Sequence, residues 1–200
     1  MDEFETKVLN AVHRIEELYF QTNGKCYVSF SGGKDSTVLL ALIKMSVDIN
    51  VLPPEGITAV FADTGIELDI TYQFVKWCKE NWYPNIEIIR PVKPFGWVMA
   101  NEGKPLRSKI KAREIGAFHN NGEATPSQIS FLVYGKSLNG KTYSRFKLAD
   151  RDMHMVSTNF DIKASNKCCT YMKKTPFKKY EKENGRVPEW TVPVPEWSCL

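Results

Sequence analysis

The sequence predicts an α/β domain in which helices cover a parallel sheet. Three short apolar segments, at residues 25–30, 57–62 and 86–89, alternate with two helical segments. This alternation, with short connections, predicts parallel strands joined by right-handed crossovers. The nearly continuous apolar character of residues 25–30 is typical of a strand that is buried on both faces of a sheet.

The helical segments are recognised by the spacing of their apolar residues. Residues 3–20 alternate apolar and charged positions at helical spacing, and Asn23-Gly24 ends that helix. Further helices are expected from Ser36 or Thr37 to Met45 and from Asp69 to about Trp82. Beyond residue 94 the pattern weakens. There we expect short helices at residues 95–101 and from Thr125-Pro126, and a helix over residues 168–182 that is interrupted at Pro176.

Composition excludes several classes of protein. The chain has 200 residues, 42% of them hydrophobic and 25% charged, as in ordinary globular proteins. No apolar run approaches the length of a membrane span, and the acidic N-terminus does not resemble a signal peptide. We therefore expect a cytoplasmic protein with no membrane partner.

The charge is unevenly placed along the chain. A net charge of +4 is too small to argue for nucleic acid by itself. Residues 163–186, however, contain seven lysines and one arginine but only two acids, Glu181 and Glu183. This stretch is either a solvated helix face or an electropositive rim for a polyanion such as a nucleotide or DNA.

The segment with the clearest chemistry follows the first strand, where residues 31–36 read Ser-Gly-Gly-Lys-Asp-Ser. Two glycines between a strand and a helix bring backbone N–H groups close to an anion, and the helix N-terminus points its dipole at the same place. Lys34 adds a full charge, and hydroxyl donors come from Ser31, Ser36 and Thr37. The loop is not a Walker loop, because Asp35 follows Lys34, nor is it G-x-G-x-x-G.

Three blocks of residues resemble one family. Residues 31–36 look like the pyrophosphate loop of the adenine-nucleotide α-hydrolase (PP-loop) superfamily. Residues 61–65 (Phe-Ala-Asp-Thr-Gly), with the following residues up to Val75, resemble the phosphoadenylylsulfate (PAPS) reductase family. Residues 161–180 resemble the short PAPS-reductase-like proteins of bacteriophages. Together these blocks extend the resemblance over residues 25–186.

The resemblance implies a three-layer α/β/α fold of the HUP-like type with a mostly parallel, five-stranded sheet. An adenine nucleotide, either ATP or PAPS, would lie across that sheet. Residues 31–37, including Gly32 and Gly33, would hold the phosphates, and Asp63, Thr64 and Gly65 would lie near the adenosine. Lys34 and Asp35 would be catalytic, Lys34 by stabilising charge, and either Asp35 or Asp63 would help to place a Mg²⁺ ion. Lys109 or Arg113 would reach the far end of the anion.

The sequence also departs from the family. Reducing members carry the attacking thiol in a Glu-Cys-Gly-type segment, whereas Cys199 is flanked by Ser198 and Leu200. Some relatives hold a [4Fe–4S] cluster with a Cys-Cys pair and a Cys-x-x-Cys motif. Here only the pair Cys168-Cys169 is present, so an iron–sulfur cluster is not expected. The chain divides into a nucleotide-binding domain, residues 1–186, and a Pro/Trp-rich tail, residues 187–200, in place of the family's C-terminal anion-binding element.

Three classes of function stay open at this point. The first is an enzyme that acts on ATP, with pyrophosphate release, or on PAPS or its relative APS, with a thiol from a partner such as thioredoxin. The second is a non-catalytic nucleotide-binding or regulatory phage protein. The third is a DNA-modification or defence module. A homodimer is compatible with all three.

Overall fold

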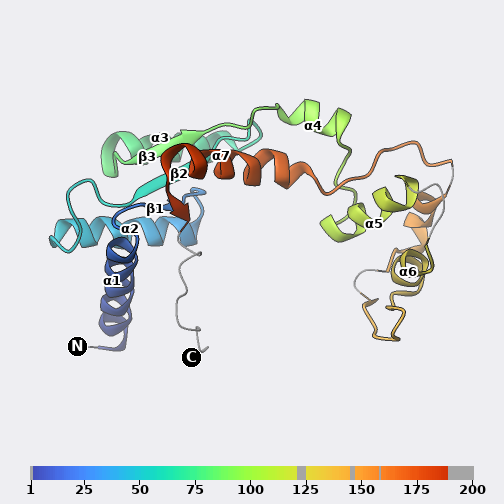
Figure 1. The fold of residues 1–200 in the computed structure, drawn as a ribbon, viewed down its shortest axis with the longest axis horizontal. Coiled ribbons are helices and arrows are strands. Elements are labelled where there is room, and N and C mark those ends of the chain that lie inside the picture. The colour runs from blue at the N-terminus through green and yellow to red at the C-terminus, as the bar shows by residue number, and fades with distance from the viewer. Residues whose placement is uncertain (1, 121–124, 145–146, 158, 189–200) are drawn as a thin grey trace. The chain divides into compact units, whose positions relative to one another are not determined.

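The computed structural model describes residues 2–120, 125–144, 147–157 and 159–188. The chain divides into two compact units. Unit 1 comprises Met1–Pro91 and Thr175–Leu200, and unit 2 comprises Val92–Lys174. Figure 1 shows the elements of both units in chain order.

Unit 1 is built on a parallel sheet. Its strands are β1 (Cys26–Ser29), β2 (Thr58–Ala62), β3 (Ile86–Ile89) and the short β4 (Val187–Pro188), in the order β3-β2-β1-β4. All three pairings are parallel, with Tyr27 opposite both Thr58 and Pro188. The predicted alternation of strands and helices is therefore confirmed, with each of the first three strands within two residues of its expected bounds.

The expected five-stranded sheet is wrong, because the described residues form four strands. After β3 the chain enters unit 2, whose described residues contain only isolated β-bridges and no strand of the sheet. When the chain returns to unit 1, it adds β4 alone. Of the predicted tail, only Val187 and Pro188 lie within the described residues, and the boundary at residue 186 stays a prediction.

Four helices flank this sheet: α1 (Glu3–Gln21), α2 (Lys34–Asp48), α3 (Asp69–Trp77) and α7 (Thr175–Asn184). A capping box between Asp2 and Glu5 begins α1. A π-helical turn, η1 (Cys78–Trp82), prolongs α3, so the predicted helix from Asp69 to Trp82 is present but not regular. The second helix begins at Lys34, two or three residues before its predicted start at Ser36 or Thr37.

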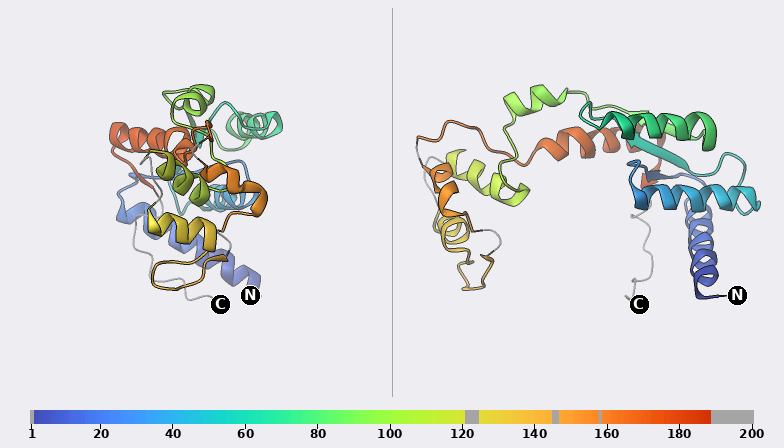
Figure 2. Two further views of the ribbon diagram at one scale, coloured as in Figure 1. Left: turned by 90° about the vertical axis from the view of Figure 1, so that its right-hand side faces the viewer. Right: turned by 180° about the vertical axis from the view of Figure 1, so that it is seen from behind.

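The two faces of the sheet bury different helices. On β1, Cys26 and Val28 point into the larger core, which contains Ile15 of α1, Leu40 of α2 and Val75 of α3. Tyr27, between them, points to the opposite face and packs against Tyr180 and Phe177 of α7. In the left view of Figure 2, the green helix α3 and the red helix α7 accordingly lie on opposite sides of unit 1. This alternation is the period of two that strands impose on their side chains.

Unit 2 is helical. Its elements are α4 (Phe95–Asn101), α5 (Lys109–Asn120), α6 (Pro126–Ile129), η2 (Ser130–Tyr134), η4 (Asp150–Val156) and η5 (Thr170–Lys174). Their buried residues form a separate core, made of Ile115, Leu132, Leu148, Met155 and Ala164. The expected helix at residues 95–101 and the helix start at Thr125-Pro126 are confirmed, whereas α5 was not predicted.

The helix expected over residues 168–182 is irregular before Pro176 and is not interrupted there. Helical residues begin at Cys168, the π-helical turn Thr170–Lys174 follows, and α7 begins directly after it at Thr175. Pro176 therefore lies within a run of consecutive helical residues, next to a π-helical turn, and both are common causes of an irregular helix. Within the described residues, no helix is both long enough and apolar enough to cross a membrane.

Candidate nucleotide-phosphate site

The loop at residues 31–37 connects β1 to α2 through a sharp turn. Gly32 has a left-handed backbone, with φ +71°, and Gly33 is the extended N-cap of α2, with φ −82° and ψ 167°. A Cβ atom on Gly32 would lie 3.1 Å from Cγ2 of Thr71 and 3.2 Å from Cγ2 of Val75, both on α3. Both the backbone angle and the space therefore favour glycine at this position.

The hydroxyl groups of the loop hold it together from within. Ser31 Oγ and Ser36 Oγ lie 3.0 Å apart, and Ser31 Oγ accepts a hydrogen bond from Gly33 N–H at 3.3 Å. The hydroxyls of Ser36 and Thr37 lie 3.0 and 2.9 Å from the carbonyl oxygen of Gly33. These contacts fix the loop's shape, and they give the predicted hydroxyl donors an internal role in this structure.

The first turn of α2 leaves a set of backbone donors open. The first helical hydrogen bond of α2 runs from Thr37 N–H to the carbonyl oxygen of Gly33. The N–H groups of Lys34, Asp35 and Ser36 have no acceptor among the described residues. Because these donors lie at the positive end of a helix dipole, with the exposed Lys34 beside them, the loop can bind an anion such as a phosphate.

The end of β2 carries the second group of predicted residues, at the same edge of the sheet as the loop. Asp63 N–H donates to the carbonyl oxygen of Ile89 on β3, and Asp63 Oδ1 accepts from Gly65 N–H at 3.1 Å. Thr64 is buried, and its hydroxyl donates to Glu67 at 2.9 Å. Gly65 has φ +75°. The carboxyl ends of β1 and β2 therefore bring both predicted groups to one edge, where ligands of parallel α/β sheets bind.

Arg90 belongs to this edge but was not predicted. It follows β3, and its Nε donates to Asp63 Oδ2 at 2.9 Å. Hydrogen bonding to Asp63, and more weakly to Tyr72, raises the pKa of the Arg90 guanidinium. The Asp63 side chain is only 14% exposed, whereas that of Arg90 is 70% exposed. The only signal in the sequence was the position of a basic residue directly after a predicted strand.

The remaining predicted residues lie in unit 2. Arg113 is paired with Glu114, and Lys109 stands at the start of α5. Cys168 and Cys169 have their sulfur atoms 4.0 Å apart and are half-buried. Burial, and then the adjacent Cys169, raise the pKa of Cys168, so its thiol is protonated near neutral pH. Within the described residues, no group of three or more His, Cys, Asp or Glu side chains gathers as a metal site.

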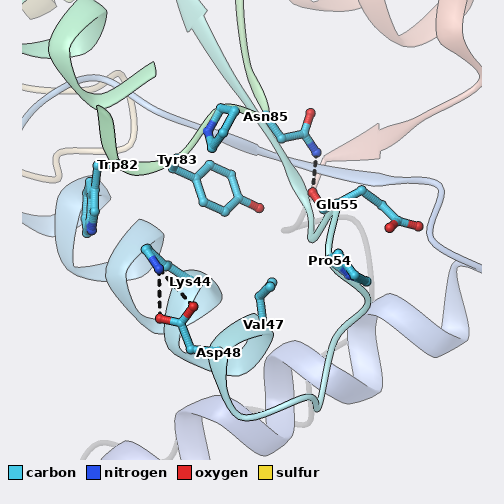
Figure 3. A pocket seen from close by; sticks show the side chains of 9 residues that line it. Lys44, Val47, Asp48, Pro54, Glu55, Trp82, Tyr83 and Asn85 are labelled. Carbon is cyan, nitrogen blue, oxygen red and sulfur yellow. Dashed lines mark hydrogen bonds and ion pairs between the residues drawn. The ribbon is translucent and has the colours of Figure 1, made fainter. Parts of the chain in front are cut away.

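A small cavity in unit 1 lies at the other edge of the sheet. It has a volume of about 180 Å³ and is lined by the last turns of α2 and by the segments that precede β2 and β3. Figure 3 shows the rings of Trp82 and Tyr83, the Lys44–Asp48 ion pair, and Asn85, which donates to the carbonyl oxygen of Glu55. None of the predicted site residues lines this cavity. The cavity lies near the N-terminal ends of β2 and β3, whereas the predicted residues follow the C-terminal ends of β1 and β2.

Comparison with known proteins agrees with this geometry. Residues 25–119 match the model of the phosphoadenosine phosphosulfate reductase domain, a range that includes both edge loops and Arg90. The resemblance to this family is thereby confirmed over that range, and the closer likeness to phage proteins stays a prediction. An uncharacterized protein of Methanocaldococcus jannaschii is 29% identical over 107 residues, which is 54% of this chain but only 24% of that protein. No solved structure matches the chain.

Proposed function

We propose that this chain, whose residues 25–119 carry a phosphoadenosine phosphosulfate reductase domain of the PP-loop superfamily, binds an adenine nucleotide with its phosphates on the loop at residues 31–37. The observation that supports this most strongly is the set of three open N–H groups at Lys34, Asp35 and Ser36. Backbone donors at a helix N-terminus bind phosphate without any change in loop conformation. Thr64 and Asp63, at the end of the neighbouring strand, are the residues proposed to face the adenosine.

For the reaction, we propose attack on the α-phosphorus of ATP. A nucleophile from the second substrate forms a bond to that phosphorus, the bond to the bridging oxygen breaks, and pyrophosphate leaves. Lys34 and the open N–H groups stabilise the negative charge that develops on the departing pyrophosphate. The loop's internal hydroxyl contacts hold these donors in place before the substrate arrives, which lowers the cost of reorganisation.

The two thiols among the described residues of unit 1 favour ATP over a sulfonucleotide. Reduction of PAPS or APS requires a thiol that attacks sulfur, but Cys26 and Cys78 are both buried in the core. Burial also raises the pKa of Cys78, which disfavours the nucleophilic thiolate. In the alternative reaction, we propose that the thiol is supplied by a partner of the thioredoxin type.

The loop also fits a magnesium ion that arrives with a triphosphate. Such an ion needs only one or two protein carboxylates besides the phosphate oxygens. Asp35 is exposed in the first turn of α2 and forms no ion pair with a described cation, whereas Asp63 is occupied by Arg90 and Gly65. Asp35 is therefore the residue proposed to hold the ion, which would neutralise charge on the phosphate oxygens.

Calorimetric titration with ATP and Mg²⁺, and separately with PAPS, tests the proposed site. We expect Lys34→Ala to weaken the binding of the preferred nucleotide by about tenfold or more, since hydrogen bonds and contacts to a charged group contribute roughly 1.5–3 kcal/mol. Lys79→Ala, which removes an exposed lysine of η1, is the matched control and should bind normally.

The products identify the reaction. AMP or an adenylylated product together with pyrophosphate would establish the ATP reaction, and sulfite formed from PAPS with a dithiol would establish reduction instead. Tight binding that depends on Lys34 but gives no product with any acceptor would indicate a regulatory nucleotide-binding protein. Equal affinities in Lys34→Ala and the unaltered chain would refute the proposed site.

A further inference from the structure

The two units differ sharply in charge. Unit 2 contains fifteen lysines and arginines but only six aspartates and glutamates, which gives it a net charge of +9. The rest of the chain contains twelve basic and seventeen acidic residues, a net charge of −5. The overall charge of +4 therefore conceals a strongly basic unit within the chain.

The few acids of unit 2 do little to reduce this excess. Glu102, Glu114 and Asp152 are each held by an arginine or lysine of the same unit. Many lysines of unit 2 form no ion pair with a described carboxylate: Lys93, Lys104, Lys109, Lys111, Lys136, Lys141, Lys147, Lys163, Lys173 and Lys174. Nearly all of these side chains are exposed, so their charges are available to a partner.

Aromatic rings stand beside lysines near the beginning of unit 2. The ammonium group of Lys93 lies 4.7 Å from the centre of the Trp97 ring, which is 37% exposed. The Trp97 ring in turn lies 6.4 Å from that of Tyr171. Lys163 Nζ donates to the carbonyl oxygen of Asn101 at the end of α4, and Lys167 Nζ donates to the neighbouring Glu102. Together these lysines and rings form what we call the lysine–aromatic surface.

The fold holds this surface in a defined shape. Lys104 N–H donates to the carbonyl oxygen of Lys163, and Ser165 N–H donates to the carbonyl oxygen of Lys104. These two hydrogen bonds join the segment after α4 to residues 163–165. Glu102 accepts from Lys167 Nζ and from the Tyr171 hydroxyl, each at 2.8 Å. These contacts lower the pKa of Glu102, so its carboxylate persists and keeps the lysine and the tyrosine in position.

We propose that the lysine–aromatic surface binds single-stranded nucleic acid. Lysine ammonium groups attract the phosphates, and the exposed ring of Trp97 offers a face on which an unpaired base stacks. The combination of a basic surface with aromatic platforms is what single strands require, whereas a duplex keeps its bases stacked on one another. This binding is separate from nucleotide binding at residues 31–37, because it involves other residues in the other unit.

Fluorescence anisotropy of the full chain with labelled oligonucleotides tests the proposal. Single-stranded DNA and single-stranded RNA of one mixed sequence are compared with the corresponding DNA duplex over a series of salt concentrations. We expect one or both single strands to bind more tightly than the duplex, and the difference between DNA and RNA identifies the natural ligand. Unlabelled polyglutamate serves as a competitor that carries charge without bases.

Two matched pairs of variants locate the site. Trp97→Ala should weaken single-strand binding by about tenfold, while Trp97→Phe, which keeps an aromatic face, should retain most of it. Trp77→Ala removes a tryptophan of unit 1 that is 53% exposed, and it should have no effect. Replacing both Lys93 and Lys163 by Gln should lower the slope of log K against log salt by about 1.4, since each contact with a single strand contributes about 0.7.

The corresponding charge control replaces Lys7 and Lys79 of unit 1 by Gln and should leave the salt dependence unchanged. Lys34→Ala should also bind the strand normally, which separates this proposal from that of the nucleotide site. The proposal is overturned if no strand binds at low salt, if the duplex binds as tightly as the single strands, or if Trp97→Ala has no effect in a folded protein. Efficient competition by polyglutamate would equally overturn it, in favour of an acidic protein partner.

Discussion

Gly32 combines a left-handed backbone with a close approach to α3. Any other residue at φ +71° carries strain of about 1–2 kcal/mol. A Cβ atom at 3.1–3.2 Å from Thr71 and Val75 would in addition push the loop away from that helix. The positions of the open N–H groups at Lys34 to Ser36 therefore depend on a residue that contributes no side chain of its own.

The variant Gly32→Ala is expected to lose both stability and nucleotide affinity. The unfolding free energy should fall by about 1–2 kcal/mol or more, because of the backbone strain and the added contacts. Gly185→Ala is the matched control, since Gly185 has φ +61° but nothing within 4 Å of its Cβ position. It should lose stability through strain alone and bind nucleotide normally. Urea unfolding and calorimetry measure the two effects, and normal binding by Gly32→Ala would contradict this account of the loop.

The turn after β1 could be predicted from its own residues, but the contact between Asp63 and Arg90 could not. Ser-Gly-Gly-Lys-Asp-Ser after an apolar strand predicts the turn, and it predicts the helix start to within two or three residues, because these features are local in sequence. Arg90 is twenty-seven positions away from Asp63, and their contact arises only when β3 lies beside β2. Contacts that depend on strand pairing leave no local pattern in the sequence.

The helix α7 covers one face of the sheet through two tyrosines. Tyr27 of β1 donates to Glu181 of α7 at 2.8 Å, and Tyr180 of α7 donates to Glu87 of β3 at 3.0 Å. Burial, followed by the neighbouring glutamate, raises the pKa of Tyr27. Burial is also the main reason that the pKa of Tyr180 rises to about 12. These hydrogen bonds connect α7, which comes late in the sequence, to β1 and β3, which come early in it.

The tyrosines of this face should make the protein less stable at alkaline pH. In the unfolded chain a tyrosine ionises near pH 10, whereas the folded protein keeps Tyr180 neutral up to about pH 12. A raised folded-state pKa contributes stability that is fully present below the unfolded pKa and is lost as the pH rises toward the folded one. Tyr180→Phe should therefore lose less unfolding free energy than the unaltered protein when the pH is raised from about 8 to about 11.

Urea unfolding of both proteins at the two pH values measures this difference. The variant also lacks the hydrogen bond to Glu87, so we expect it to be about 1 kcal/mol less stable at the lower pH. Ile129→Ala, a change at a 40% exposed residue of unit 2 that adds no titrating group, controls for general destabilisation. An equal alkaline loss in Tyr180→Phe and the unaltered protein would show that Tyr180 does not contribute to the pH dependence.

Elements with strong local signals were predicted better than those that depend on packing. The strands predicted at residues 25–30, 57–62 and 86–89 are short, largely apolar segments. The helix α5 was missed because it contains Gly116, which weakens helix propensity. In the structure, the position of Gly116 is so close to the carbonyl oxygen of Ala164 that a Cβ atom would collide with it. The glycine thus serves a tertiary contact that the sequence does not reveal.

Over the molecule as a whole, the sequence predicted the parallel sheet better than the division of the chain into two units. The parallel sheet and both loops at its carboxyl edge were expected, but the fifth strand was wrong, because residues 92–174 form a helical unit of their own. The separation of charge between the units was also missed. The sequence pattern indicated an excess of basic residues only at residues 163–186. The division of the chain shows that the excess belongs to unit 2 as a whole, whereas unit 1 has a net negative charge.

The proposed nucleotide site depends on one interaction, the binding of adenine-nucleotide phosphates by the open N–H groups of the loop. Amide chemical shifts of ¹⁵N-labelled protein, recorded over the whole chain during a titration with ATP and Mg²⁺ or with PAPS, test it most directly. We predict that the amides of Lys34, Asp35 and Ser36 shift most and saturate together, and that in Lys34→Ala the loop amides saturate only at about tenfold higher nucleotide concentration or above. Saturable shifts confined to other residues, with these three amides unchanged, would contradict the account.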